Sequence, residues 1–267
     1  MNIVELKERL KNEKVNTELY CFDVEFPNEA LCLIKNHEKW EVYYSEKGIK
    51  TGIVIFNNEE SACEYFYFEI VTNSLNMGIS ISSKWNEIIE KLKKVGVMFE
   101  KGLSFKEIEN IETKYKVKFP PDLKEFYLFG LPISKGFINW RNESNENVEK
   151  IKECLEWPLE GMLFDIENNS FWYKDWGKKP ESISDAKEKC KKELKNVPNL
   201  IPIYSHRYIP TKPYEENNPI FSVLQTDIIY YGKNLIDYFE NEFKLKQDKI
   251  KYLSEYKRIE FWSDIIE

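Results

Sequence analysis

The sequence predicts a mixed α+β fold, on two kinds of pattern that both occur near its N-terminus. Residues 39–45 alternate apolar and polar side chains, and residues 51–56 return after a turn at Glu46–Gly48, which is typical of a β-hairpin. In the same region Ile3, Leu6 and Leu10 recur at three- and four-residue spacing, which is typical of an amphipathic helix. The elements expected in residues 1–72 are a helix at 2–14, strands at 30–34, 39–45 and 51–56, and a helix capped by Asn57 or Asn58. Together they predict a small α-β-β-β-α unit.

Residues 73–83 are polar and contain a glycine, so they are expected to form a linker. After the linker, helix starts are marked by local chemistry. Ser104 and Glu107 form a capping box, and Pro121 occupies a first helical turn. Helices are predicted at 83–95, 104–115, 120–129, 145–156, 180–194 and 234–243, and strands at 136–140, 161–166, 200–205, 219–225 and 227–231. A domain boundary is therefore predicted between residues 80 and 81, giving domains 1–80 and 81–267.

Composition restricts the classes of partner. The 267 residues carry a net charge of -7, and the basic residues are 35 Lys and only 4 Arg. An acidic, arginine-poor chain disfavours a nucleic-acid surface. The longest run without a charged residue is 70–83, too short and too polar for a membrane span, and the charged N-terminus does not fit a secretory signal. Five cysteines without a Cys-x-x-Cys pair suggest reduced thiols and a cytoplasmic location.

The segment 102–127 reads Gly-Leu-Ser, an amphipathic helix, then Phe-Pro-Pro-Asp and a second helix. It resembles the opening of the SUKH superfamily. Three later blocks are similar to that family in the same order: 163–167 with 172–177, 201–210 and 218–232. The resemblance covers about residues 83–243. The N-terminal segment 26–66 also looks like a second small immunity module of bacteria.

The SUKH resemblance implies an α+β domain with a largely antiparallel sheet and packed helices. Bacterial members commonly act as immunity proteins against polymorphic toxins, without a catalytic centre, and fungal members regulate cell-wall assembly. The expected function is therefore a cytoplasmic immunity protein that binds a cognate toxin domain, such as a nuclease, with no cofactor and no nucleic-acid or membrane partner. One alternative is an interaction or regulatory scaffold without a toxin partner, and the oligomeric state is left open.

A third alternative is a metal-dependent hydrolase that uses Asp165 and Glu167. These residues lie two apart on a predicted strand, so they are expected to face the same side, where paired carboxylates suit a metal or acid–base chemistry. The alternative interpretation is that the two carboxylates simply lie on a solvent-exposed strand face. His206 is preceded by Ser205, but neighbours on a strand face opposite ways, and no Gly-x-Ser-x-Gly motif is present. The sequence therefore predicts no catalytic residue and no metal ligand.

The remaining candidates are contacts to a protein partner. Exposed aromatic anchors ringed by acids are expected to make the strongest contacts, because Trp, Tyr and Arg dominate binding energetics. Core packing is the alternative for each ring. The candidate anchors are Trp172, Trp176, Tyr204, His206, Arg207 and Tyr214. A glutamate stripe that includes Glu146, Glu149 and Glu153 is either a solvated helix face or a surface that steers a basic partner.

Overall fold

The computed structural model of the protein describes residues 1–22, 27, 29–78, 84–246 and 256–266. Within these residues the protein has the predicted α+β fold, with two four-stranded sheets and one two-stranded sheet. The chain divides into two compact units, Met1–Ile89 with Lys101–Glu107 and Tyr127–Gly130, and Glu90–Glu100 with Ile108–Phe126 and Leu131–Glu267. The predicted boundary between residues 80 and 81 falls in 79–83, outside the described residues.

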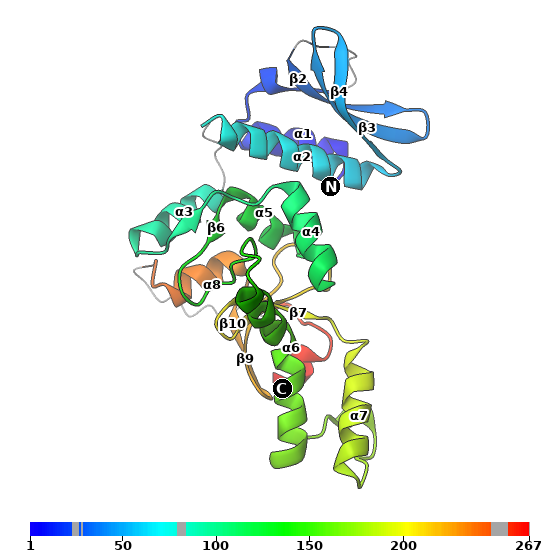
Figure 1. The fold of residues 1–267 in the computed structure, drawn as a ribbon, viewed down its shortest axis with the longest axis vertical. Coiled ribbons are helices and arrows are strands. Elements are labelled where there is room, and N and C mark those ends of the chain that lie inside the picture. The colour runs from blue at the N-terminus through cyan, green and yellow to red at the C-terminus, as the bar shows by residue number, and fades with distance from the viewer. Residues whose placement is uncertain (23–26, 28, 79–83, 247–255, 267) are drawn as a thin grey trace. The chain divides into compact units, whose positions relative to one another are not determined.

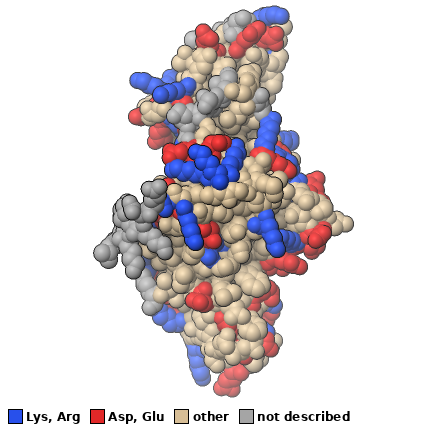
Figure 2. All heavy atoms as spheres, turned by 90° about the vertical axis from the view of Figure 1, so that its left-hand side faces the viewer, with Lys and Arg blue, Asp and Glu red and all other residues tan. Residues whose placement is uncertain are grey.

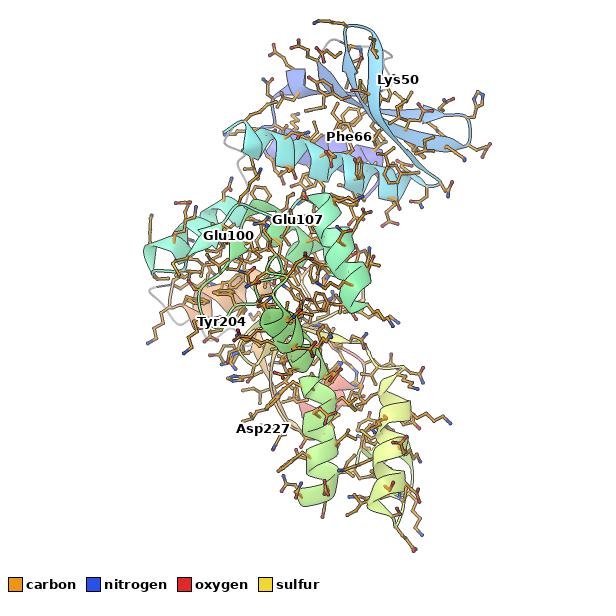
Figure 3. All side chains as sticks on the ribbon, viewed as in Figure 1. Lys50, Phe66, Glu100, Glu107, Tyr204 and Asp227 are labelled. Atoms are coloured by element: carbon orange, nitrogen blue, oxygen red, sulfur yellow. The ribbon has the colours of Figure 1, made fainter. Side chains whose placement is uncertain are left out.

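The first unit contains a sheet in the order β1-β2-β3-β4, with two helices on one face (Figure 1). Its elements are α1 (Ile3–Asn12), η1 (Thr17–Leu19), β1 (Tyr20–Phe22), β2 (Ala30–Asn36), β3 (Lys39–Glu46), β4 (Ile49–Phe56) and α2 (Glu59–Asn76). Strands β2, β3 and β4 are antiparallel, whereas β1 pairs in parallel with β2. The fully buried Phe66 lies on α2 (Figure 3). Its ring contacts the rings of Tyr20 and Phe22.

Two expectations for this unit are corrected. The predicted α-β-β-β-α order lacks β1, because a strand of only three residues leaves almost no alternation to detect. The predicted linker also begins too early, because α2 continues through Asn73 and ends at Asn76. Residues 79–83 of that linker lie outside the described residues.

The elements after the first sheet are α3 (Lys84–Lys94), β5 (Phe99–Glu100), α4 (Phe105–Tyr115), α5 (Pro121–Phe129), β6 (Leu131–Pro132), α6 (Asn145–Asn168), η2 (Lys174–Trp176), α7 (Ile183–Leu194), β7 (Leu200–Tyr204), β8 (Arg207–Pro210), β9 (Ile220–Leu224), β10 (Asp227–Gly232), α8 (Leu235–Glu242) and α9 (Trp262–Ile266). In the second unit, β10-β9-β8-β7 form an antiparallel sheet. Helix α6 contacts β7, β9 and α7, while α8 and α9 contact β10 (Figure 1). Among the described residues, no helix is long and apolar enough to cross a membrane.

Helix α6 overturns the predicted strand at 161–166, since residues 145–168 form one helix that contains Pro158. Proline lacks the N–H that would bond the carbonyl of residue 154, four positions earlier. The hydroxyl of the buried Tyr208 donates to the Cys154 carbonyl at 2.9 Å and so satisfies it from outside the helix. The predicted strand at 136–140 is also wrong, because its only ladder contact among the described residues is a bridge between Phe137 and Tyr204.

Candidate protein-interaction surface

Helix α6 divides sharply into a buried face and an exposed face. Its N-cap Ser144 accepts a hydrogen bond from the Asn147 amide, and its inner side buries Ile151, Met162 and Ile166. Residues at three- and four-residue intervals lie on the other side, as helix geometry requires. We call this side the α6 outer face. It consists of the exposed residues Glu146, Glu149, Glu153, Trp157, Glu160 and Phe164.

Two large aromatic side chains stand exposed on the α6 outer face. Trp157 is 44% exposed and Phe164 is 49% exposed. They are seven residues apart, or about 10 Å along the helix axis at 1.5 Å per residue. A single exposed apolar residue is normal on a protein surface and indicates no function. Large exposed aromatic rings that share one face are the kind of residue that a partner protein buries in an interface. Here the two rings share one face with four glutamates.

The tip of the β9–β10 hairpin is fixed beside these rings. Gly161 lets the backbones approach closely, because a Cβ there would lie 2.7 Å from the Cα atom of Gln225. The buried Asp165 accepts hydrogen bonds from the amide of Thr226 at 2.9 Å and from its hydroxyl at 2.5 Å. The hairpin residue Leu224 is 54% exposed next to this junction. Helix and hairpin therefore present one supported surface.

A hollow of about 540 Å³ lies along this surface, lined by Trp157, Phe164, Gly161 and Gln225, and by Lys187 and Lys191 of α7. It is within the size range that accepts a small ligand or a protruding side chain. Lys187 is already paired with Glu167 at 2.5 Å, and Lys191 with Glu188 at 3.0 Å. The hollow thus combines apolar walls with a rim that includes two ion-paired lysines.

Asp165 and Glu167 do not face the same side, contrary to expectation. On a helix, residues two apart lie about 200° apart around the axis. Asp165 is buried against the β9–β10 turn, while Glu167 is exposed and bound to Lys187. Burial alone would raise the pKa of Asp165, but the hydrogen bonds from Thr226 and Asn169 outweigh it and hold that pKa below its ordinary value. No group of three or more His, Cys, Asp or Glu side chains in the described part of the chain could hold a metal ion.

The two tryptophans proposed as anchors belong to the packing of the loop after α6. Trp176 is 6% exposed and stacks on Phe261, with ring centroids 5.8 Å apart. Trp172 is half-buried, meets the Trp176 ring edge-on, and donates from its indole nitrogen to the Gly177 carbonyl at 2.7 Å. The structure therefore gives both rings a role inside the fold.

Three further candidates, Tyr204, His206 and Arg207, meet at the β7–β8 turn. Arg207 is buried, and its Nε lies 3.1 Å from Oε2 of Glu242. Its guanidinium carbon lies 3.6 Å from the centroid of the Tyr231 ring. The ring of Tyr204 packs edge-on against Phe137 and Phe243. Both residues thus also have packing partners within the fold.

Ser205 and His206 are closer than a strand would allow. Ser205 has a φ of 51° in the turn between β7 and β8, so the two side chains come together, with Oγ and Nδ1 3.2 Å apart. The expectation that they face opposite ways is wrong, because it assumed an unbroken strand through 205. Burial, together with the positive charge of Arg207, lowers the pKa of His206.

Tyr214 lies on a different element, between β8 and β9. It is 41% exposed, and its hydroxyl accepts a hydrogen bond from the buried Lys124 at 2.9 Å. The candidates from sequence are therefore spread over the loop after α6, the β7–β8 turn, the segment before β9 and the α6 outer face. Of these, the glutamates are the ones that lie beside exposed apolar rings.

No protein-family model, curated protein or solved structure matches this chain.

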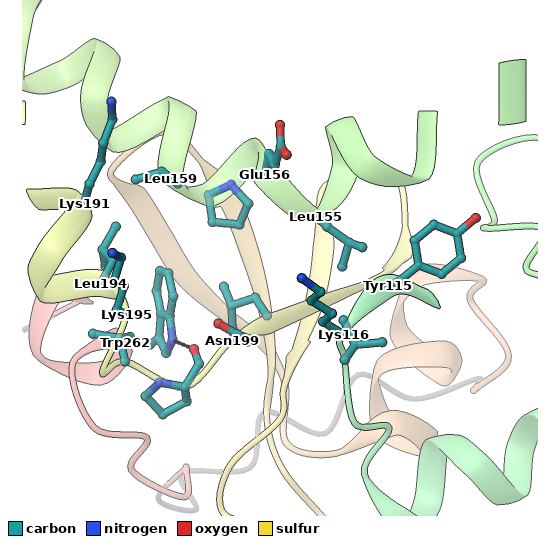
Figure 4. A pocket seen from close by; sticks show the side chains of 15 residues that line it. Tyr115, Lys116, Leu155, Glu156, Leu159, Lys191, Leu194, Lys195, Asn199 and Trp262 are labelled. Atoms are coloured by element: carbon teal, nitrogen blue, oxygen red, sulfur yellow. Dashed lines mark hydrogen bonds between the residues drawn. The ribbon is translucent and has the colours of Figure 1, made fainter. Parts of the chain in front are cut away.

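A second cavity, of about 460 Å³, lies on the other side of α6 (Figure 4). Trp262 and Leu155 lie on opposite sides of it, and the Trp262 indole donates to the Pro198 carbonyl at 2.6 Å. Lys116 and Lys195 are at its edge, directly after the ends of α4 and α7. Cations at helix C-termini offset the partial negative charge of the terminal carbonyls. These lysines therefore have a structural reason for their positions.

Trp157 and Phe164 were missed from sequence because the predicted helix ended at 156, before Trp157, while Phe164 fell in the predicted strand 161–166. The signal that would have found them is the continuation of the glutamate spacing, 146, 149, 153, through 157, 160 and 164. Read as one helix across Pro158, this spacing puts both rings on the same face as the acids. On the face of the molecule drawn in Figure 2, acidic and basic side chains are interspersed.

Proposed function

We propose that the protein is a non-catalytic immunity protein, which binds a cognate toxin domain in the bacterial cytoplasm and blocks it. The resemblance of residues 83–243 to the SUKH superfamily supports this proposal, and the α+β fold agrees with what that resemblance implies. The observation that carries it is the α6 outer face. Two aromatic side chains there are about half exposed on a rigid helix, which is the form that anchors of protein interfaces take.

The α6 outer face is built for recognition by contact. Its backbone is fixed in a helix that packs on the sheet, so partner binding need not order a backbone segment there. Neutralisation then requires only that the bound partner's active surface be covered or distorted. The protein needs no reactive group of its own for that task.

We expect a large toxin gene directly upstream, and the proposal is tested by co-expression with the C-terminal domain that this gene encodes. We expect the protein to co-purify with that domain and to restore growth of cells in which the domain is toxic. A catalytically inactive version of the domain serves as the control, because it allows binding to be measured without selection. Failure of the purified pair to associate, with growth still arrested, would contradict the proposed function.

A further inference from the structure

We infer that the α6 outer face is the docking site for a cationic surface of the partner domain, with Trp157 and Phe164 as its two anchors. This inference rests on the proposed function and names the partner chemistry and the contact site. It goes further than the sequence, which suggested the glutamates as a steering rim but placed the aromatic anchors elsewhere.

Charge is the first argument. Helix α6 carries seven acidic and two basic side chains, a formal charge of -5, while the whole chain carries -7. Within the described part of the chain, Glu146, Glu153 and Glu160 of the outer face form no ion pair. These three carboxylates therefore have no direct ion-pair partner there, and they attract a basic surface at close range.

The negative charge of the α6 outer face also decides which class of molecule can bind there. A second copy of this chain would bring its own α6 outer face, or another surface of a protein with net charge -7, against unpaired glutamates. Phospholipid surfaces and nucleic acids are anionic and would be repelled likewise. A protein face rich in Lys or Arg, with an apolar recess for aromatic rings, fits both the charge and the exposed rings.

Geometry supplies the second argument. The two rings stand on the same side of one helix, and the hollow of about 540 Å³ separates them from the lysines of α7. Gly161 and Asp165 tie this helix to the β9–β10 hairpin, so the rings are presented on a supported surface. An apolar side chain of the partner can enter the hollow while basic side chains meet the glutamates.

The anchors are tested in the complex with the partner domain by Trp157→Ala and Phe164→Ala, measured by titration calorimetry. We expect each substitution to raise the dissociation constant by about 30-fold or more, which is the effect expected of an interface hot spot. The matched control is Ile183→Ala, because Ile183 is 48% exposed on the neighbouring α7 and outside the proposed face. Circular dichroism checks that each variant is folded, as expected for exposed positions.

The charge contribution is tested by neutralising Glu146, Glu153 and Glu160 to glutamine together. We expect the association rate to fall about tenfold at low salt, and the difference from wild type to vanish at 0.5 M salt, because the Debye length is then only about 4 Å. The control neutralises three exposed acids on other segments. These are Glu109, Glu181 and Glu260.

The outcomes separate the two proposals. If wild type does not bind the partner domain, the proposed function and this inference both fail. If wild type binds and all the α6 variants bind equally well, the function stands and the docking site is refuted. Equal losses in the control variants would also refute it. A wild-type dimer in sedimentation that Trp157→Ala abolishes would assign the face to a second copy and overturn the inference.

Discussion

Pro158 in the middle of α6 and the hydroxyl of Tyr208 form a pair whose coupling can be measured. The perturbation is Tyr208→Phe, which keeps the buried ring and removes only the hydroxyl that donates to the Cys154 carbonyl at 2.9 Å. In the native helix no amide can replace it, since residue 158 is proline. An unsatisfied carbonyl in this partly buried setting costs about 1–2 kcal/mol of unfolding free energy.

The same substitution in a Pro158→Ala background should cost much less. Alanine provides the amide that the Cys154 carbonyl normally meets in a helix, so the hydroxyl is no longer needed. We expect Tyr208→Phe to cost less than about 0.5 kcal/mol there, which gives a coupling of about 1 kcal/mol between the two positions.

The assay is urea unfolding of the four proteins of this cycle, followed by tryptophan fluorescence. Only Trp40 lies in the first sheet, so the signal reports mainly on residues beyond 84. Additive effects, with a coupling below about 0.3 kcal/mol, would refute the argument that Tyr208 replaces the missing helical bond.

Three further outcomes follow from the described contacts. Trp176→Ala should destabilise the fold by about 3–5 kcal/mol and Trp157→Ala by less than about 1 kcal/mol, because one ring is 6% and the other 44% exposed; equal shifts in melting temperature would contradict this. Gly161→Ala should cost about 1–3 kcal/mol, since its Cβ would lie 2.7 Å from backbone, whereas Glu160→Ala beside it should change urea stability by less than about 0.5 kcal/mol. Because the pKa of Asp165 is lower in the folded state, its ionised form stabilises the protein above the unfolded pKa of about 3.9, and this contribution is lost as pH falls through the folded value. The urea midpoint of wild type should therefore fall more steeply below pH 4 than that of Asp165→Asn, and parallel pH profiles would show that the carboxylate is not the cause.

Much of the secondary structure could be predicted from the sequence because it depends on residues that are close together in the chain. The hairpin of β3 and β4 follows from alternation and the turn at Glu46–Gly48. The helix α4 follows from the capping box, in which Ser104 and Glu107 exchange hydrogen bonds as predicted. These elements depend on residues within one or two turns of each other, so a single sequence contains the information.

The errors arise where distant residues decide the local structure. The run 161–166 is mostly apolar and follows a proline, so it looks like a strand. Helix α6 continues through it, and Tyr208, 54 residues after Cys154, satisfies the carbonyl that Pro158 leaves without an amide. The prediction of the candidate site failed for the same reason. The glutamates could be assigned to one face, whereas Trp157 and Phe164 could not join them until the helix was known to be continuous. Burial of Trp176 depends on Phe261, which no local pattern reveals.

The strict separation of the two faces of α6 has a consequence for how such a protein can diversify. Residues that tie the helix to the rest of the unit, such as Gly161 and Asp165, are constrained by backbone contact and by buried hydrogen bonds. Outer-face residues such as Trp157 and Phe164 are exposed, so a substitution there changes the surface at little expense in folding free energy. Under the proposed function, a lineage can therefore change its partner one outer residue at a time, while descendants keep the same scaffold and differ mainly along a single stripe of one helix.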